Sequence, residues 1–92
     1  MIKTNREKKY VLFGAGEYGK RAIRYLSEEK IAYFLDNDRR KTGTNIEGIP
    51  VYLLEEKRSE LINYTVVISV SKEKEDTIAR QLDKEGVTEY IH

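Results

Sequence analysis

Tyr10-Val11-Leu12-Phe13-Gly14-Ala15-Gly16-Glu17-Tyr18-Gly19 is the stretch that decides the fold. Its first four residues form an apolar run rich in β-formers, which favours a strand buried on both faces. The remaining six have the spacing G-x-G-x-x-G, and the segment 20–26 continues with helical periodicity. The stretch therefore predicts a strand, a tight glycine turn and a helix in direct succession.

Further short apolar runs follow at intervals that leave room for helices between them. We expect strands at 31–35, 48–52, 65–70 and 87–91, helices around 54–62 and 71–85, and a loop over 37–48. In the first helix Tyr18, Ala22, Tyr25 and Leu26 fall on one face, and the last helix should carry Ile78, Ala79 and Leu82 inward. The helix between them is marked by Leu54, Leu61 and Ile62. Alternating strands and helices predict an α/β fold: a small, doubly wound, mainly parallel sheet between two helix layers. The strand Tyr10–Phe13 should lie at its centre, between 31–35 and 65–70.

Each glycine of the motif has a separate physical role in the predicted turn. Gly14 permits the tight turn from strand to helix, and Gly19 lets the helix pack close to the sheet. Gly16 has no Cβ, so a phosphate can approach the backbone and meet the free N–H groups that begin the helix. The same letters, Gly14–Lys20, also spell G-x-x-x-x-G-K, but a P-loop requires Ser or Thr where this sequence has Arg21.

An acidic residue follows the second predicted strand, where a ribose would lie. Asp36 comes 22 residues after Gly14, and its two carboxylate oxygens suit the two hydroxyls of a ribose diol. Its charge disfavours a 2′-phosphate, although the basic run 39–41 can offset that effect. Ser69 and Ser71 lie at the end of the fourth predicted strand, so they are either further ligand contacts or only a strand end and a helix cap.

Composition excludes several classes of function. The 92 residues suit one domain, predicted at 10–92 behind a flexible basic lead-in at 1–9. Seventeen basic and 16 acidic residues give a net charge of +1, so no nucleic-acid partner is expected. Without cysteine, and with His92 as the one histidine, neither a catalytic nor a metal site is expected. The apolar runs are too short for a membrane span, which favours a cytoplasmic protein or part of one.

The sequence resembles a domain of bacterial surface-polysaccharide enzymes over residues 9–91. The most specific parts are Gly14-Ala15-Gly16 with Gly19, Asp36 followed by Asp38-x-x-Lys41-x-Gly43, and Gly48-Ile49-Pro50-Val51. Similar domains precede the left-handed β-helix of nucleotide-sugar acyltransferases, where they hold the UDP-sugar. Others precede nucleoside-diphosphate-sugar dehydratases and are usually labelled NAD(P)- or CoA-binding. The acyltransferases' catalytic histidine lies in the β-helix, which is absent from this sequence.

The resemblance implies a Rossmann-like nucleotide-binding module of a polysaccharide-biosynthesis enzyme, with NAD(P) or a UDP-sugar as cofactor or ligand. The parent protein would be a nucleotide-sugar dehydratase, epimerase or acyltransferase, and the isolated domain would not be catalytic. A stand-alone NAD(H)-binding sensor and a structural dimerisation domain, each a possible homo-oligomer, stay open as alternatives. The residues expected to bind the nucleotide are Gly14, Ala15, Gly16, Glu17, Tyr18, Gly19, Asp36, Asn37, Arg39, Ser69 and Ser71.

Overall fold

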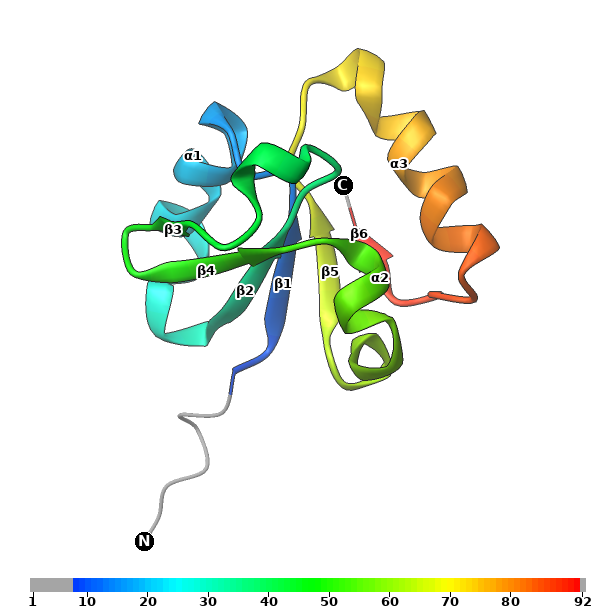
Figure 1. Ribbon diagram of the computed structural model, residues 1–92, viewed down its shortest axis with the longest axis horizontal. Coiled ribbons are helices and arrows are strands. Elements are labelled where there is room, and N and C mark those ends of the chain that lie inside the picture. The colour runs from blue at the N-terminus through cyan, green and yellow to red at the C-terminus, as the bar shows by residue number, and fades with distance from the viewer. Residues whose placement is uncertain (1–7, 92) are drawn as a thin grey trace, which may run out of the picture.

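A six-stranded sheet runs through the computed structural model, which describes residues 8–91 (Figure 1). The strands are β1 (Tyr10–Phe13), β2 (Ile31–Leu35), β3 (Asn45–Ile46), β4 (Ile49–Tyr52), β5 (Thr65–Ile68) and β6 (Tyr90–Ile91). The α-helices are α1 (Glu17–Leu26), α2 (Leu54–Lys57) and α3 (Lys72–Lys84). Three 3₁₀ helices complete the chain: η2 (Glu28–Lys30), η3 (Arg39–Lys41) and η4 (Arg58–Asn63).

The strand order confirms the predicted α/β fold. The order across the sheet is β3-β4-β2-β1-β5-β6, and β1 pairs in parallel with both β2 and β5. The pairs β2–β4 and β5–β6 are also parallel, whereas β3 runs antiparallel to β4. In a parallel sheet all carboxyl ends lie at one edge, so the segments that follow β1, β2 and β5 meet there.

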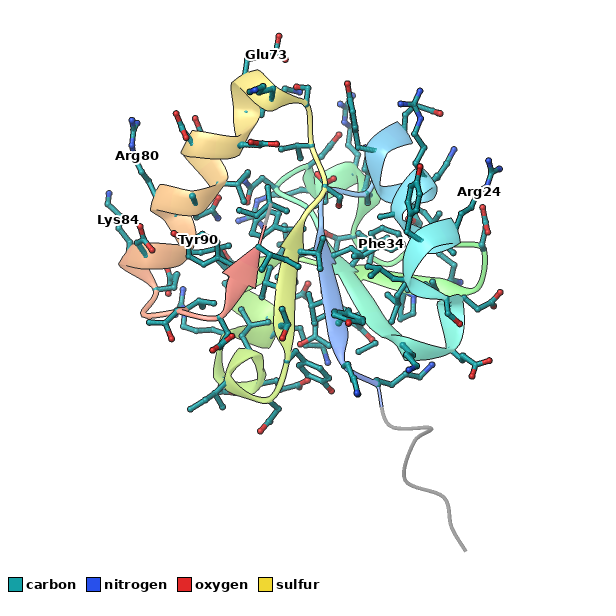
Figure 2. The ribbon with its side chains drawn as sticks, turned by 180° about the vertical axis from the view of Figure 1, so that it is seen from behind. Arg24, Phe34, Glu73, Arg80, Lys84 and Tyr90 are labelled. Atoms are coloured by element: carbon teal, nitrogen blue, oxygen red, sulfur yellow. The ribbon has the colours of Figure 1, made fainter. Side chains whose placement is uncertain are left out.

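Helices cover both faces of the sheet, which gives the expected three layers. On one face α1 packs through Ile23 over Leu12 and Phe34, and Figure 2 shows Phe34 beside this helix. On the other face α2, η4 and α3 contribute Leu54, Leu61, Ile78 and Leu82 to a second cluster. The central strand alternates between the two clusters, with Val11 and Phe13 on one side and Leu12 on the other.

The expected face of α1 differs in part from the observed one, and the helix expected around 54–62 divides into an α-helical and a 3₁₀ part. In α1 the tyrosines at 18 and 25 are 48% and 87% exposed, and the buried residues are Gly19 and Ile23. After α2 the chain tightens into η4, which buries Leu61 but leaves Ile62 89% exposed. A 3₁₀ helix has three residues per turn instead of 3.6, so the residues that share a face differ from those of an α-helix.

The predicted loop 37–48 contains regular structure. Asp38 caps η3 by accepting a hydrogen bond from the N–H of Arg40, at 3.0 Å. Strands β3 and β4 form a hairpin whose two connecting residues, Glu47 and Gly48, have φ values of 51° and 85°. Positive φ at both positions is typical of a type I′ turn, for which Asn-Gly is the usual sequence signal. This turn has Glu in place of Asn, so the sequence did not indicate the hairpin.

The other predicted boundaries differ by a few residues. Strand β5 ends at Ile68 and β6 covers only Tyr90–Ile91, so both are shorter than expected. The prediction of a lead-in at 1–9 falls mostly on residues 1–7, outside the described residues. Lys9 already belongs to the sheet end: its N–H donates to the carbonyl of Lys30, and its carbonyl accepts from Thr65.

A tyrosine in the core provides a test of this packing at high pH. Burial, followed by the nearby carboxylate of Glu60, raises the pKa of Tyr33 well above its ordinary value of 10.0. When the pKa of a group is higher in the folded state than in the unfolded state, the stability that the group contributes is fully present below the unfolded-state pKa. That contribution is lost as the pH rises towards the folded-state pKa. We expect the free energy of unfolding to fall above about pH 10, by up to ~1.4 kcal/mol per pH unit from this group. Urea unfolding at pH 9 to 11.5 should show a smaller fall in Tyr33→Phe; equal slopes would contradict the assignment.

Candidate functional site

A cavity of about 500 Å³ opens at the carboxyl ends of β1 and β5 and beside Asp36, which follows β2. Figure 1 shows α1 and α3 both beginning at this edge of the sheet. The N–H groups that begin each helix lack intrahelical partners, so both helix ends favour an anion. The residues that line the cavity are Phe13, Gly14, Gly16, Glu17, Tyr18, Asp36, Asn37, Asp38, Lys41, Ser69, Val70, Ser71, Lys74 and Ile78.

Two of the motif glycines are required by close packing. Gly14 has φ +121°, and a Cβ there would lie 2.3 Å from the carbonyl oxygen of Ser69. A Cβ on Gly19 would lie 2.2 Å from the carbonyl oxygen of Gly14 and 2.8 Å from the Phe34 ring. Both distances are too short for non-bonded atoms, so the turn can be made only with glycine at these positions.

Gly16 differs from the other two because the space beside it is open. A Cβ there would meet no atom closer than the Nζ of Lys41, at 3.7 Å. Its φ of −109° is accessible to any residue. Packing within the described residues therefore does not require glycine at this position, whereas close approach of a ligand to the backbone would.

Asp36 holds the end of β2 against the glycine turn. Its Oδ2 accepts a hydrogen bond from the Ala15 N–H at 2.8 Å, and its Oδ1 accepts one from the Asp38 N–H at 2.8 Å. The Lys41 Nζ lies 3.8 Å from Oδ2. Each carboxylate oxygen has two lone pairs, so the capacity to accept from ribose hydroxyls is retained alongside this structural role.

The two serines after β5 have different surroundings. Ser69 is buried, and its hydroxyl lies 3.1 Å from the carbonyl oxygen of Phe13 and 3.0 Å from that of Gly14. It ties the end of β5 to the end of β1, and its one proton is used within the protein. Ser71 occupies the N-cap position of α3, and a hydrogen bond between its side chain and Glu73 lowers the pKa of that carboxylate.

Asn37 and Arg39, both expected to bind the nucleotide, are engaged by other side chains. The Asn37 amide exchanges two hydrogen bonds with the Gln81 amide, at 2.9 and 3.0 Å, which joins the loop after β2 to α3. Asn37 still lines the cavity, but the structure does not place Arg39 in its lining. The Arg39 guanidinium lies 3.7 Å from the Glu55 carboxylate.

Two lysines in the lining were missed as site residues. Lys41 extends from η3 to the glycine turn, and Lys74 projects from the first turns of α3. Lys41 follows two arginines in the sequence, so charge alone could not single it out. The one available signal was its place in the segment Asp38-x-x-Lys41-x-Gly43.

Removal of the Asp36 carboxylate should affect both stability and binding. Two backbone N–H groups would lose a charged partner, and water can replace part of that loss because Asp36 is only partly buried, so we expect Asp36→Ala to lower the free energy of unfolding by about 1.5–3 kcal/mol. We also expect affinity for NAD to fall more than affinity for NADP, because the repulsion of a 2′-phosphate would be removed. Thermal melting with calorimetry on this variant checks both effects. An unchanged melting temperature would contradict the bracing role, and equal losses for the two cofactors would contradict the diol role.

Comparison with solved structures supports the Rossmann-like fold. UDP-D-quinovosamine 4-dehydrogenase from Vibrio fischeri is 29% identical, with a TM-score of 0.66 over 88% of this chain and 74% of that one. The Rex-family repressor RSP is 20% identical, with a TM-score of 0.68 over 90% of this chain. The aligned region is 43% of the RSP chain, so that likeness concerns the fold of less than half of it. Among curated proteins, none matches the sequence.

The comparison corrects the expected exclusion of nucleic acid as a partner. RSP has been crystallised with both β-NAD⁺ and operator DNA, and in that complex it matches 88% of this chain at a TM-score of 0.64. A net charge near zero in one such domain therefore does not exclude nucleic acid for a protein that contains it, and the prediction was wrong. For membranes, none of the helices between residues 8 and 91 has the length and apolar character of a membrane span.

The family assignment comes from the sequence as a whole. Residues 6–91 match the family described as C2185-like, N-terminal. This match covers the glycine turn, Asp36 and all the strands that build the cavity edge. The chain belongs to the C2185-like N-terminal domain family.

Proposed function

We propose that the domain binds a nucleotide in the cavity between α1 and α3, as a non-catalytic module of a nucleotide-sugar-modifying enzyme. The observation that carries the proposal is the open space beside Gly16. There the packing does not require glycine, yet the helix N-terminus and the cavity converge. The position of Asp36 beside the same turn supports a ribose next to the phosphates.

The enzyme class follows from the solved structure that is 29% identical. That protein is a UDP-D-quinovosamine 4-dehydrogenase, whose name gives a UDP-sugar as its substrate. Such chemistry involves two nucleotides, a UDP-sugar and a nicotinamide cofactor, and either presents a ribose and a diphosphate to a glycine turn. The proposal therefore names NAD(H) and UDP-sugars as the ligands to be compared.

A second candidate function is NAD(H) sensing. RSP, which shares the fold, has been crystallised with β-NADH and with β-NAD⁺. In this alternative the domain would respond to the redox state of the cofactor. It predicts a difference in affinity between NADH and NAD⁺ and no binding of UDP-sugars.

One screen tests the proposal and separates the two candidates. Thermal melting should be recorded with NAD⁺, NADH, NADP⁺, UDP-GlcNAc, CoA and ATP, with calorimetry on each compound that raises the melting temperature. A saturating ligand at 100 times its Kd stabilises by about 2.7 kcal/mol, which shifts the melting temperature by roughly 10 °C or more in a domain of this size. No shift with any nucleotide would contradict the proposed function.

A further inference from the structure

Three consecutive basic residues in η3 point to three different partners. Arg39 lies by Glu55 at 3.7 Å, and the Arg40 Nε lies 3.0 Å from Asp38 Oδ1. Hydrogen bonds from Arg40 lower the pKa of the Asp38 carboxylate. Of the three, Lys41 alone lines the cavity.

Lys41 lies at the glycine turn itself. Its Nζ is 3.5 Å from the carbonyl oxygen of Ala15 and 3.8 Å from Asp36 Oδ2, and it is the nearest atom to a Cβ built on Gly16. The backbone of η3 fixes this placement. The Lys41 N–H donates to the carbonyl of Asp38, and its own carbonyl accepts from the Thr44 hydroxyl at 2.6 Å.

Lys74 faces the same cavity from the opposite wall. It belongs to α3, and its exposed side chain contributes to the lining together with Ser71. Lys41 on η3 and Lys74 on α3 therefore both line the cavity at which α1 and α3 begin.

Three carboxylates line the same cavity: Glu17, Asp36 and Asp38. Glu17 lies by Lys20 and Asp38 by Arg40, so Asp36, next to the turn, is the charge that a phosphate would meet unless Lys41 offset it.

We infer that Lys41 and Lys74 together bind the two phosphates of the ligand, so the site selects a nucleoside diphosphate derivative whose ribose carries no phosphate. Lys41 neutralises the phosphate at Gly16 and shields it from Asp36, and Lys74 pairs with the second phosphate. Neither arginine of η3 lines the cavity, and each lies beside a carboxylate, so the loop after β2 places neither of them where a 2′-phosphate would lie. The inference rests on the proposed nucleotide binding and adds the class of ligand.

Calorimetry on lysine variants tests the inference. The probes are NAD⁺, NADP⁺, ADP-ribose and UDP-GlcNAc, with adenosine and uridine as phosphate-free counterparts. Lys41→Gln and Lys74→Gln should each weaken binding of the diphosphates by about 10- to 150-fold, the value of one charge-assisted hydrogen bond, and leave the nucleosides unchanged. The affinity of Lys41→Arg for the diphosphates should stay within a few-fold of the wild-type value. This result would show that binding needs the positive charge and not the particular contact of Lys41 with the Ala15 carbonyl.

Lys84→Gln is the matched control, because it removes the same charge from α3. Figure 2 shows Lys84 at the end of this helix opposite to Glu73, and Lys84 does not line the cavity, so its loss should change no affinity. If the wild type binds diphosphates but Lys41→Gln and Lys74→Gln bind them equally well, the inference is overturned and the proposed function stands. A loss confined to NADP⁺ in Lys41→Gln would also overturn it, since Lys41 would then face a 2′-phosphate. If the wild type binds no nucleotide, the proposed function fails first.

Discussion

Gly14→Ala is expected to lower the free energy of unfolding by about 2–6 kcal/mol. A φ of +121° lies outside the range of L-residues and costs about 1–3 kcal/mol, and forcing a methyl group into packed atoms costs a further ~1–3 kcal/mol. The added Cβ would lie 2.3 Å from the Ser69 carbonyl oxygen and 2.6 Å from Val70 Cγ1, so β5 would have to move away from β1. Small domains have a total stability of about 5–15 kcal/mol, so the upper end of this loss would unfold a domain at the lower end of that range.

Urea unfolding followed by circular dichroism measures the effect, with Gly43→Ala as the matched control. Gly43 also has a positive φ, +85°, but no atom lies within 4 Å of its Cβ position. Gly43→Ala should therefore cost only the backbone strain, about 1–2 kcal/mol. If the two variants lost equal stability, the close contact between the turn and β5 would not be the reason for glycine at position 14.

Gly16→Val is expected to abolish nucleotide binding and leave the fold intact. The branched side chain would fill the space beside the turn, where the free N–H groups of α1 would otherwise reach a phosphate. Loss of two charge-assisted hydrogen bonds corresponds to about 100-fold or more in affinity. Among the described residues, the atom that a Cβ at position 16 would meet is the Lys41 Nζ, at 3.7 Å. This atom is the end of a flexible side chain, so the melting temperature should change by only a few degrees.

Calorimetry and thermal melting on the same preparation check this prediction, and Gly16→Ala provides an intermediate case. The smaller methyl group should weaken binding less than the isopropyl group does. Retention of wild-type affinity in Gly16→Val would contradict the phosphate-binding role of the turn. A large fall in melting temperature would instead show that Gly16 is needed for folding.

The parts of the fold that were predictable from the sequence are those set by local pattern. The apolar run 10–13, the glycine spacing and the next apolar run 31–35 act over a few residues each, so β1, the turn, α1 and β2 could be placed. The buried face of α1 could not. The centre of that face is Gly19, which packs closely against the sheet but has no apolar side chain to indicate it. The prediction therefore placed the face on the neighbouring tyrosines, Tyr18 and Tyr25, which are exposed.

The cavity lining was predictable where residues belong to the glycine turn, as Glu17 and Tyr18 do, or lie just after a strand. Asp36 and Ser69 are of the second kind, because the strand ends carry them to the shared edge of the sheet. The residues of η3 depend on partners that lie elsewhere, such as Glu55 for Arg39. Their division between cavity and surface is a tertiary property, which explains why Arg39 was expected at the site and Lys41 was not.

A titration followed by ¹H–¹⁵N NMR tests the central claim most directly, because it locates the ligand as well as detecting it. NAD⁺ and UDP-GlcNAc should each be added to the labelled domain. If the cavity binds a nucleotide, at least one of them will shift the amide signals of 14–19, 36–41 and 69–74 together, in a saturable manner. Signals of the distant hairpin turn at Glu47 and Gly48 should stay in place. Saturation with shifts elsewhere, or no shifts at millimolar concentrations of either compound, would contradict the account.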